Sequence, residues 1–200
     1  MPETGVKKKG NHNVLIGILI ASAITGGAVW RHKTGPYHFK VVQPGMLYRS
    51  GWMKPAHEQQ IIEKYGIKTV VNLCLPNEEL EENNHTVEAA ICKRTGAALV
   101  NIPMPGNTPP TEEQLAEWLH LLHGREHHPI LVHCAQGVAR TGIMIAVYRM
   151  DCLKEDNVSV FEKLDTFKHD FDVPKRKAVK EFILNYKPAR DVPVAADIRP

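Results

Sequence analysis

The chain has 200 residues, of which 43% are hydrophobic and 24% charged, and this composition suits one globular domain with a buried core plus a short extension. The formal net charge is +3, and the lysines and glutamate of residues 1–30 contribute +2, so the rest of the chain is close to neutral. A near-neutral domain excludes the basic footprint of a nucleic-acid-binding protein, and we expect no nucleic-acid partner. The four cysteines show no Cys-x-x-Cys spacing, so a disulfide framework is not predicted.

The N-terminal segment has the pattern of a membrane anchor. Residues 14–30 form an uncharged, largely apolar run that follows three lysines and precedes Arg31 and Lys33. As a helix this run is just long enough to cross the hydrocarbon core of a bilayer. We therefore predict that residues 1–33 form one hydrophobic helix, which makes the membrane a partner and gives a single-pass membrane location. A signal peptide cleaved near Ala21-Ser22-Ala23 is the alternative, and the protein would then be secreted.

The sequence of the first half of the domain predicts alternating strands and helices. Residues 39–42 and 46–49 indicate a short strand pair, and Pro55 opens a helix that runs to Tyr65. Residues 68–73 predict a buried strand, residues 78–95 a helix, and residues 97–102 another strand. This alternation is typical of an α/β domain with a central, mostly parallel sheet flanked by helices.

The second half completes the domain with helices. Thr111 and Gln114 form a capping box, and a helix with apolar residues at i, i+3, i+4 and i+7 follows it. Residues 130–133 predict the central strand and residues 141–152 a buried helix, and residues 158–167 and 175–186 predict two further helices. The catalytic domain is thus expected over residues 34–187, with residues 188–200 as a flexible tail.

A phosphate-binding loop follows the central strand. Cys134 ends that strand, and Arg140, Thr141 and Gly142 follow after five intervening residues. Backbone N–H groups at the start of a helix bind anions, and the same field favours a thiolate at Cys134, which is the predicted nucleophile. Arg140 offers a planar fork for two phosphoryl oxygens, Thr141 can donate to the leaving sulfur, and His133 can orient the loop from behind. The substrate-binding backbone is expected from Ala135, Gln136, Gly137, Val138 and Ala139.

This run carries a family resemblance. His-Cys-x5-Arg-Thr-Gly, with the upstream Tyr48-Arg49-Ser50-Gly51, residues 65–73 and Pro105-Gly106-Asn107, resembles the cysteine-dependent dual-specificity and tyrosine phosphatases, especially the atypical plant-and-fungal branch and its bacterial relatives. The resemblance covers residues 48–186. It implies the α/β cysteine-phosphatase fold, a phosphocysteine intermediate on Cys134, phosphoryl binding by Arg140, and neither a metal nor another cofactor. The expected function is hydrolysis of a phosphorylated protein or another phosphomonoester.

Two features depart from that family pattern. The loop carries no charge apart from Arg140, which favours a phosphorylated protein or a simple membrane phosphoester, whereas relatives that act on highly phosphorylated inositols tend to have a basic loop. A lipid or inositol phosphate phosphatase stays an alternative. No aspartate precedes His133, although many relatives place an aspartate general acid upstream of the cysteine. A membrane-tethered phosphate-binding module without turnover is therefore a second alternative.

We expect the general acid to come from the loop over residues 102–113, where Glu112 and Glu113 are the titratable groups. Both also fit a structural role as negative charges at a helix start. Asp170 or Asp172 folding back towards the loop, or a water positioned by Asn107, are the other possibilities.

Three further questions stay open at this level. Arg49 can grip substrate or pair with an acidic surface residue. His120, His123, His127 and His128 can hold a metal or form a polar helix end, and we predict the latter, with no metal. The charges around residues 14–30 favour a catalytic domain outside the cell, whereas a thiolate that oxidises readily favours a reducing compartment.

Overall fold

The computed structural model describes residue 16 and residues 35–78, 83–165 and 170–188. The chain divides into two compact units, Met1–Gly35 and Pro36–Pro200, and the fold described below is that of the second. The predicted hydrophobic helix of residues 1–33 and nearly all of the predicted tail lie outside the described residues. Among the helices that are described, none combines the length and the apolar character needed to cross a membrane.

The domain is built on a five-stranded sheet with the strand order β1-β2-β5-β3-β4. Its strands are β1 (Lys40–Gln43), β2 (Leu47–Gly51), β3 (Thr69–Asn72), β4 (Ala98–Asn101) and β5 (Ile130–Cys134). Only the β1–β2 pair is antiparallel, and the other three pairs are parallel. The predicted α/β class with a mostly parallel central sheet is confirmed.

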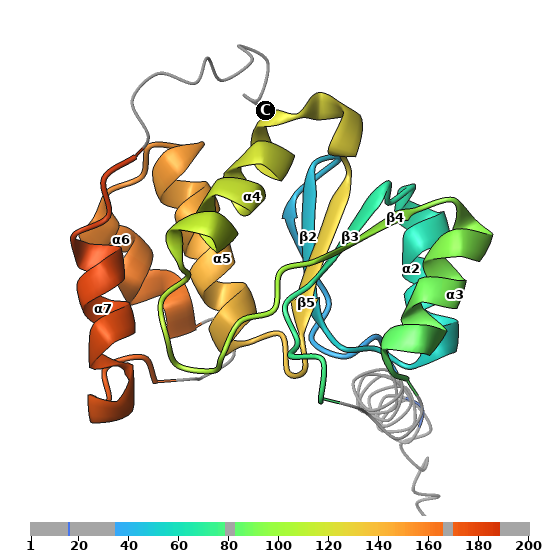
Figure 1. Ribbon diagram of the computed structural model, residues 1–200, viewed down its shortest axis with the longest axis horizontal. Helices are drawn as coiled ribbons and strands as arrows, with labels where there is room; N and C mark the ends of the chain where they lie inside the picture. Colours follow the sequence, from blue (N-terminus) through green and yellow to red (C-terminus); the bar gives the residue numbers. More distant parts are fainter. Residues whose placement is uncertain (1–15, 17–34, 79–82, 166–169, 189–200) are drawn as a thin grey trace, which may run out of the picture. The chain divides into compact units, whose positions relative to one another are not determined.

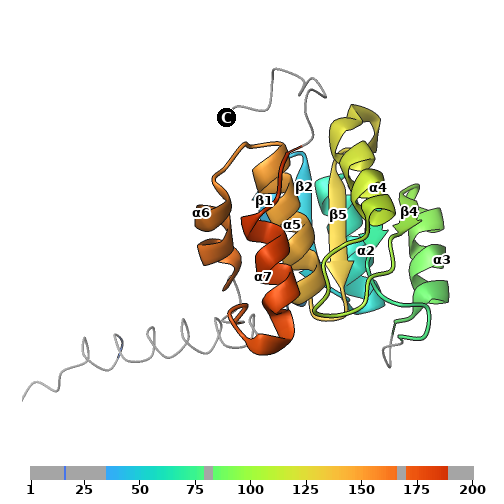
Figure 2. The same ribbon diagram turned by 60° about the vertical axis from the view of Figure 1, so that its left-hand side comes forward.

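Helices cover both faces of the sheet (Figures 1 and 2). One face carries α2 (Pro55–Tyr65) and α3 (His85–Thr95), and the other carries α4 (Glu112–His123) and α5 (Ala139–Asp151). The shorter α6 (Asn157–Glu162) and α7 (Lys177–Leu184) pack against α5 on the side away from the sheet. Because α5 lies between the sheet and these two helices, nearly all of its residues are buried. Short 3-10 turns span Arg125–His127, Lys163–Asp165 and Pro174–Arg176.

Each face of the sheet has its own hydrophobic core. The larger core joins α4 and α5 to the sheet and contains the fully buried Trp118 and Tyr148. The Trp118 indole N–H donates to the backbone oxygen of Met144 at 2.9 Å, which fixes α4 against α5. The smaller core lies under α2 and α3 and includes Val70 and Leu131. The strand that ends at Cys134 is therefore held from both faces.

The predicted helix over residues 78–95 begins later than expected, at His85. Its N-cap is Asn84, whose side-chain oxygen accepts hydrogen bonds from the backbone N–H groups of Thr86 and Val87, each at 3.1 Å. Glu78 lies in a turn before the helix, where its carboxylate accepts from the Leu75 N–H at 2.6 Å. A cap at Asn84, later in the chain, and the tertiary role of Glu78 override the predicted start.

The remaining elements follow the predictions with small shifts at their ends. The capping box of Thr111 and Gln114 is present, with Gln114 N–H donating to the Thr111 hydroxyl at 3.3 Å. The helix predicted from residue 158 starts at Asn157 and changes to a 3-10 turn at Lys163. The helix predicted from residue 175 opens as a 3-10 turn and becomes α-helical at Lys177.

Candidate active site

The central strand delivers Cys134 to the carboxyl edge of the sheet. Strand β5 lies between the parallel strands β2 and β3, and all five of its residues are buried. Helix α5 begins at Ala139, so residues 135–138 form a short loop between a buried strand and a helix N-terminus. In open α/β sheets, the carboxyl ends of the strands are where ligands bind.

Gly137 gives the loop its shape. Its φ angle is +67°, and a Cβ built there would lie 2.1 Å from the backbone oxygen of Ser50, so no other residue fits. In this conformation the Gly137 N–H donates to the Cys134 sulfur at 3.2 Å. The loop is therefore folded around its own cysteine.

Neighbouring residues hold the loop carbonyls. The Trp52 N–H donates to the Ala135 oxygen at 3.1 Å, and His38 Nδ1 lies 2.7 Å from the Gln136 oxygen. Arg49 Nη2 donates to the Gly137 oxygen at 2.6 Å. These three contacts take up carbonyl groups, which leaves backbone N–H groups of the loop to bind an anion.

Arg49 thus supports the loop, and its contact with substrate stays a prediction. Its side chain comes from β2 and is only 5% exposed. Burial lowers the pKa of Arg49 to about 10, while the nearby Cys134 favours the charged guanidinium, so the group stays protonated at neutral pH. It adds a second positive charge on the inner side of the loop.

The Cys134 thiol is poised to ionise. Burial of its sulfur opposes the thiolate, but the nearby polar groups of Thr141, the charge of Arg140 and the Gly137 N–H outweigh it, so the pKa of Cys134 lies below its ordinary value. The other three cysteines differ. Burial raises the pKa of Cys92 and Cys152 to about 12 and that of Cys74 still further. Cys134 is the one cysteine of the chain suited to nucleophilic attack.

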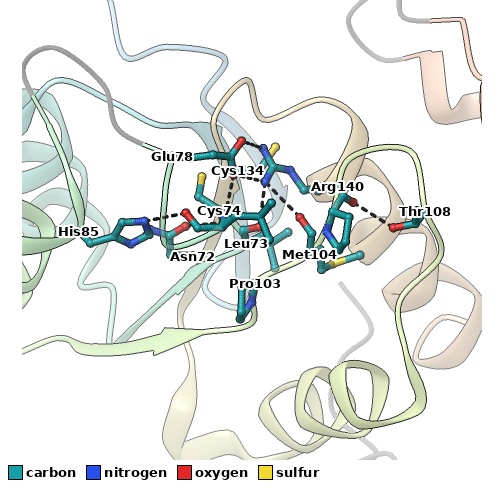
Figure 3. A network of polar contacts seen from close by, with 12 residues as sticks. Asn72, Leu73, Cys74, Glu78, His85, Pro103, Met104, Thr108, Cys134 and Arg140 are labelled. Atoms are coloured by element: carbon teal, nitrogen blue, oxygen red, sulfur yellow. Dashed lines mark hydrogen bonds and ion pairs between the residues drawn. The ribbon is translucent and has the colours of Figure 1, made fainter.

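Arg140 is fixed by a carboxylate that the sequence did not single out. Its Nη1 and Nη2 atoms lie 2.5 and 2.9 Å from the two oxygens of Glu78, and Nη1 also donates to the backbone oxygens of Leu73 and Met104 (Figure 3). This hydrogen bonding to Arg140 keeps the pKa of Glu78 below its ordinary value. Within the described parts of the chain, Nε and one Nη2 hydrogen of Arg140 have no protein acceptor, and they can bind phosphoryl oxygens.

The two residues predicted to supply the acid lie at the start of α4. Glu112 and Glu113 are exposed in the first turn of α4. A hydrogen bond from its own backbone N–H and one from Thr111 hold the pKa of Glu113 below its ordinary value, as expected for a helix start. Among the contacts of the described residues, none joins either carboxylate to Cys134 or Arg140.

Asn107 is linked to the C-terminal part of the domain. It has a φ of +63°, and its side-chain oxygen accepts from Arg176 Nε at 2.7 Å. Arg176 also donates to the backbone oxygen of Asp170, and the neighbouring Phe171 lies 3.3 Å from the position of a Cβ on Gly142. The Arg176 side chain therefore ties Asn107 to the backbone of Asp170, whose own carboxylate accepts from the Asp172 N–H at 2.7 Å. Asp172 is paired instead with Lys180 at 2.8 Å.

The histidine cluster forms a polar helix end. His123 Nε2 lies 3.3 Å from the Asp151 carboxylate, which also accepts from the Tyr186 hydroxyl at 3.1 Å. His123, Asp151 and Cys152 hold three possible metal-ligating atoms within 4.8 Å. The bond to Tyr186 explains this grouping as a contact between α4, α5 and the end of α7, and the absence of a metal stays a prediction.

The proteins that this chain resembles are phosphatases, which agrees with the chemistry of the cysteine loop. Residues 46–184 match the family model described as "DSP-PTPase phosphatase fused to NAD+ Kinase". The chain is 31% identical to inositol diphosphatase DSP3 of Arabidopsis thaliana over 118 residues. The aligned region covers 57% of this chain and 54% of that protein. It is 25% identical over 95 residues to protein tyrosine phosphatase type IVA 2 of Mus musculus, over 46% of this chain and 52% of that protein.

The chain thus spans about half the length of the curated relatives it matches. Among solved structures, the core catalytic domain of the PP-IP phosphatase SIW14 from S. cerevisiae is 27% identical, with a TM-score of 0.60 over 76% of this chain and 87% of that one. The family match covers most of the described domain and contains the whole cysteine loop. The chain therefore belongs to the family of cysteine-based phosphatases described as "DSP-PTPase phosphatase fused to NAD+ Kinase".

Proposed function

We propose that this chain hydrolyses phosphomonoesters through a phosphocysteine intermediate. The observation that carries the proposal is the Cys134 sulfur held at the N-terminus of α5, with the Gly137 N–H on it and Arg140 fixed beside it. The thiolate attacks phosphorus, the P–O bond to the leaving group breaks, and the leaving oxygen takes a proton. Water then attacks the thiophosphate, which releases inorganic phosphate and restores the thiolate.

Substitution of the two loop residues tests this reaction. Turnover of an aryl phosphate should vanish in Cys134→Ser, because a hydroxyl in this loop stays protonated. In Arg140→Lys it should fall by about 10² or more, because lysine cannot bind two phosphoryl oxygens in a plane. Glu63→Gln on the exposed side of α2 is the matched control. Wild-type turnover in Cys134→Ser would overturn the mechanism.

The substrate that we propose is a monophosphate with limited negative charge, such as a phosphorylated side chain or a simple membrane phosphoester. The loop side chains Ala135, Gln136, Val138 and Ala139 carry no charge, and the Glu78 carboxylate lies against Arg140. Both features disfavour a densely charged ligand. The tyrosine phosphatase relative supports this substrate class.

An inositol phosphate is the second candidate substrate, because the plant relative and the yeast structure act on inositol diphosphates and PP-IP, according to their names. Phosphotyrosine and phosphoserine peptides, a phosphoinositide, phosphatidylglycerophosphate and an inositol pyrophosphate, assayed in parallel, separate the two classes. Strong selectivity for the inositol pyrophosphate would contradict the first proposal.

A non-catalytic role is the alternative to turnover. Because no aspartate precedes His133, the domain can also be considered as a membrane-tethered module that binds phosphate esters without releasing product. A burst experiment distinguishes the two. Release of at most one equivalent of phosphate would favour the module, and steady release over many turnovers would exclude it.

We also propose that residues 1–33 anchor the catalytic domain to a membrane. The uncharged run of residues 14–30 between basic flanks supports this, and a cleaved signal peptide is the competing explanation. Fractionation of cells that express the full chain, followed by determination of the N-terminal sequence, tests both. Protection of the C-terminal tail from protease in intact cells would place the domain in the cytoplasm, and cleavage would place it outside.

A further inference from the structure

A buried polar cluster lies behind the cysteine loop, on the α2–α3 face of the sheet. Along β5, Val132 and Cys134 belong to the core on the α4–α5 face, whereas Leu131 belongs to the opposite core. Strand alternation therefore directs His133 towards α2 and α3. Glu58 from α2 and Glu88 from α3 meet it there, and the exposed fractions of Glu58, Glu88 and His133 are 2%, 0% and 2%.

The contacts of this cluster form a chain that ends next to the nucleophile. His133 Nε2 lies 2.8 Å from a Glu88 oxygen, and the other Glu88 oxygen accepts from Asn72 Nδ2 at 2.5 Å. The Glu88 carboxylate also lies close enough to Glu58 for each to shift the pKa of the other. One Glu58 oxygen accepts from Asn83 Nδ2 at 2.6 Å, and its other oxygen receives no N–H donor from the described residues.

The contacts of the two carboxylates favour one distribution of protons between them. Two carboxylates in contact and out of water cannot both be ionised, and a buried oxygen without a donor is best satisfied as a hydroxyl that donates to its neighbour. Glu58 is thus the protonated member of the pair. Glu88, with Asn72 and His133 as partners, is the ionised member, and its charge holds a proton on His133.

The pKa directions agree with that distribution. Burial and the charge of Glu88 raise the pKa of Glu58 to about 8. Burial opposes ionisation of Glu88, but the charge of His133 outweighs it and the pKa of Glu88 falls. Burial also opposes the charged form of His133, but Glu88 raises its pKa, with smaller contributions from Glu58 and Cys134. The cluster thus contains one negative and one positive charge.

We propose that Glu88 is a positioning residue for the nucleophile: it keeps His133 as an imidazolium directly behind Cys134, and Glu58 supports it as a neutral carboxylic acid. This rests on the proposed function, in which the Cys134 thiolate is the attacking group. The imidazolium favours the thiolate by charge, and the Glu88 contact fixes the strand residue that precedes the loop. Glu58 and Glu88 are buried behind the strand, and Glu88 contacts His133, so their effect on Cys134 passes through His133.

Other titratable groups surround the cluster. Helix α3 contributes Cys92, whose pKa is raised by the charges of both glutamates, and His85, whose Nδ1 lies 3.5 Å from Asn72 Nδ2. Cys74 follows β3, and the charges of Cys134 and Glu88 raise its pKa. Burial raises the pKa of both thiols, so they stay neutral at neutral pH and do not alter the charge balance.

The test is the pH dependence of Cys134 alkylation by iodoacetamide, because it reports thiolate without requiring turnover. Glu88→Gln should raise the midpoint by about one pH unit, since it removes the charge that protonates His133. His133→Asn should raise it similarly, and the double variant should match His133→Asn. Glu58→Gln, which keeps a neutral hydrogen-bonding side chain, should shift it less than Glu88→Gln. Glu63→Gln is the surface control.

An unchanged midpoint in Glu88→Gln, or fully additive shifts in the double variant, would overturn the proposal. If Glu88→Gln does not fold, the ¹⁵N chemical shifts of the His133 ring in the wild-type protein decide the matter at pH 7.5. Imidazolium shifts are expected, and neutral imidazole shifts would overturn the proposal. Because alkylation is independent of catalysis, a failed phosphatase assay with an intact Glu88 effect would instead count against the proposed function.

Discussion

Gly137 is the residue on which the shape of the cysteine loop depends most directly. Its backbone is in the left-handed region, and the Ser50 carbonyl occupies the space of a side chain. The sequence places Gly137 in the substrate-binding loop but does not indicate the strand packed against it. A single residue thus joins β2 to the nucleophile loop.

Gly137→Ala should lower kcat/KM by about 10² or more and destabilise the domain by about 1–3 kcal/mol, because the loop must move off Ser50 and the sulfur loses its N–H donor. The control is Gly66→Ala at the end of α2. Gly66 has a φ of +60°, but a Cβ there would meet no atom within 4 Å. The control should lose about 1 kcal/mol of stability and no activity. Equal activity of the two variants would contradict this account of the loop.

At the scale of elements, local signals predicted most of the fold. The capping box at Thr111 and the cysteine loop both lie in contiguous sequence, so their chemistry could be read without the structure. The helix start at residue 78 was wrong because Glu78 has a partner, Arg140, 62 residues away. Glu58 and Glu88 come from two helices and meet His133 from a strand, and no local pattern predicts such a meeting.

The identity of the general acid is decided between two elements. If the loop before α4 supplies it, Glu112→Gln or Glu113→Gln should slow alkyl phosphate hydrolysis about 10²-fold while sparing an aryl phosphate, whose leaving group needs no proton. Asp170, which the sequence offers as another acid, is the competing candidate. Asp170→Asn should then show the selective loss instead. Small, equal effects on both substrates in all three variants would favour an acid supplied by water.

At the scale of the whole molecule, the buried glutamate pair links stability to pH. The pKa of Glu58 is about 8 in the folded domain and near the ordinary 4.5 when unfolded. Between these values the unfolded chain releases the proton and the folded domain keeps it, so rising pH favours unfolding. Glu58→Gln removes this effect because its side chain cannot ionise.

The melting temperature of Glu58→Gln relative to wild type should therefore rise as pH increases from about 5 to about 8, and should be constant below about 4.5. Thermal unfolding monitored by circular dichroism across this range measures it. A difference that is constant above about pH 5 and falls as pH rises towards about 4.5 would show that Glu58 is the ionised member of the pair. The Glu63→Gln variant should show no such trend, since Glu63 is exposed.

The central claim is that Cys134 carries the phosphoryl group during turnover. Rapid quenching of the full chain with an aryl phosphate, followed by mass spectrometry of its peptides, tests this claim most directly. We expect one phosphoryl group on the peptide that contains Cys134, lost on continued incubation and absent in Cys134→Ser. A phosphoryl group on another residue, or multiple turnovers in Cys134→Ser, would contradict it.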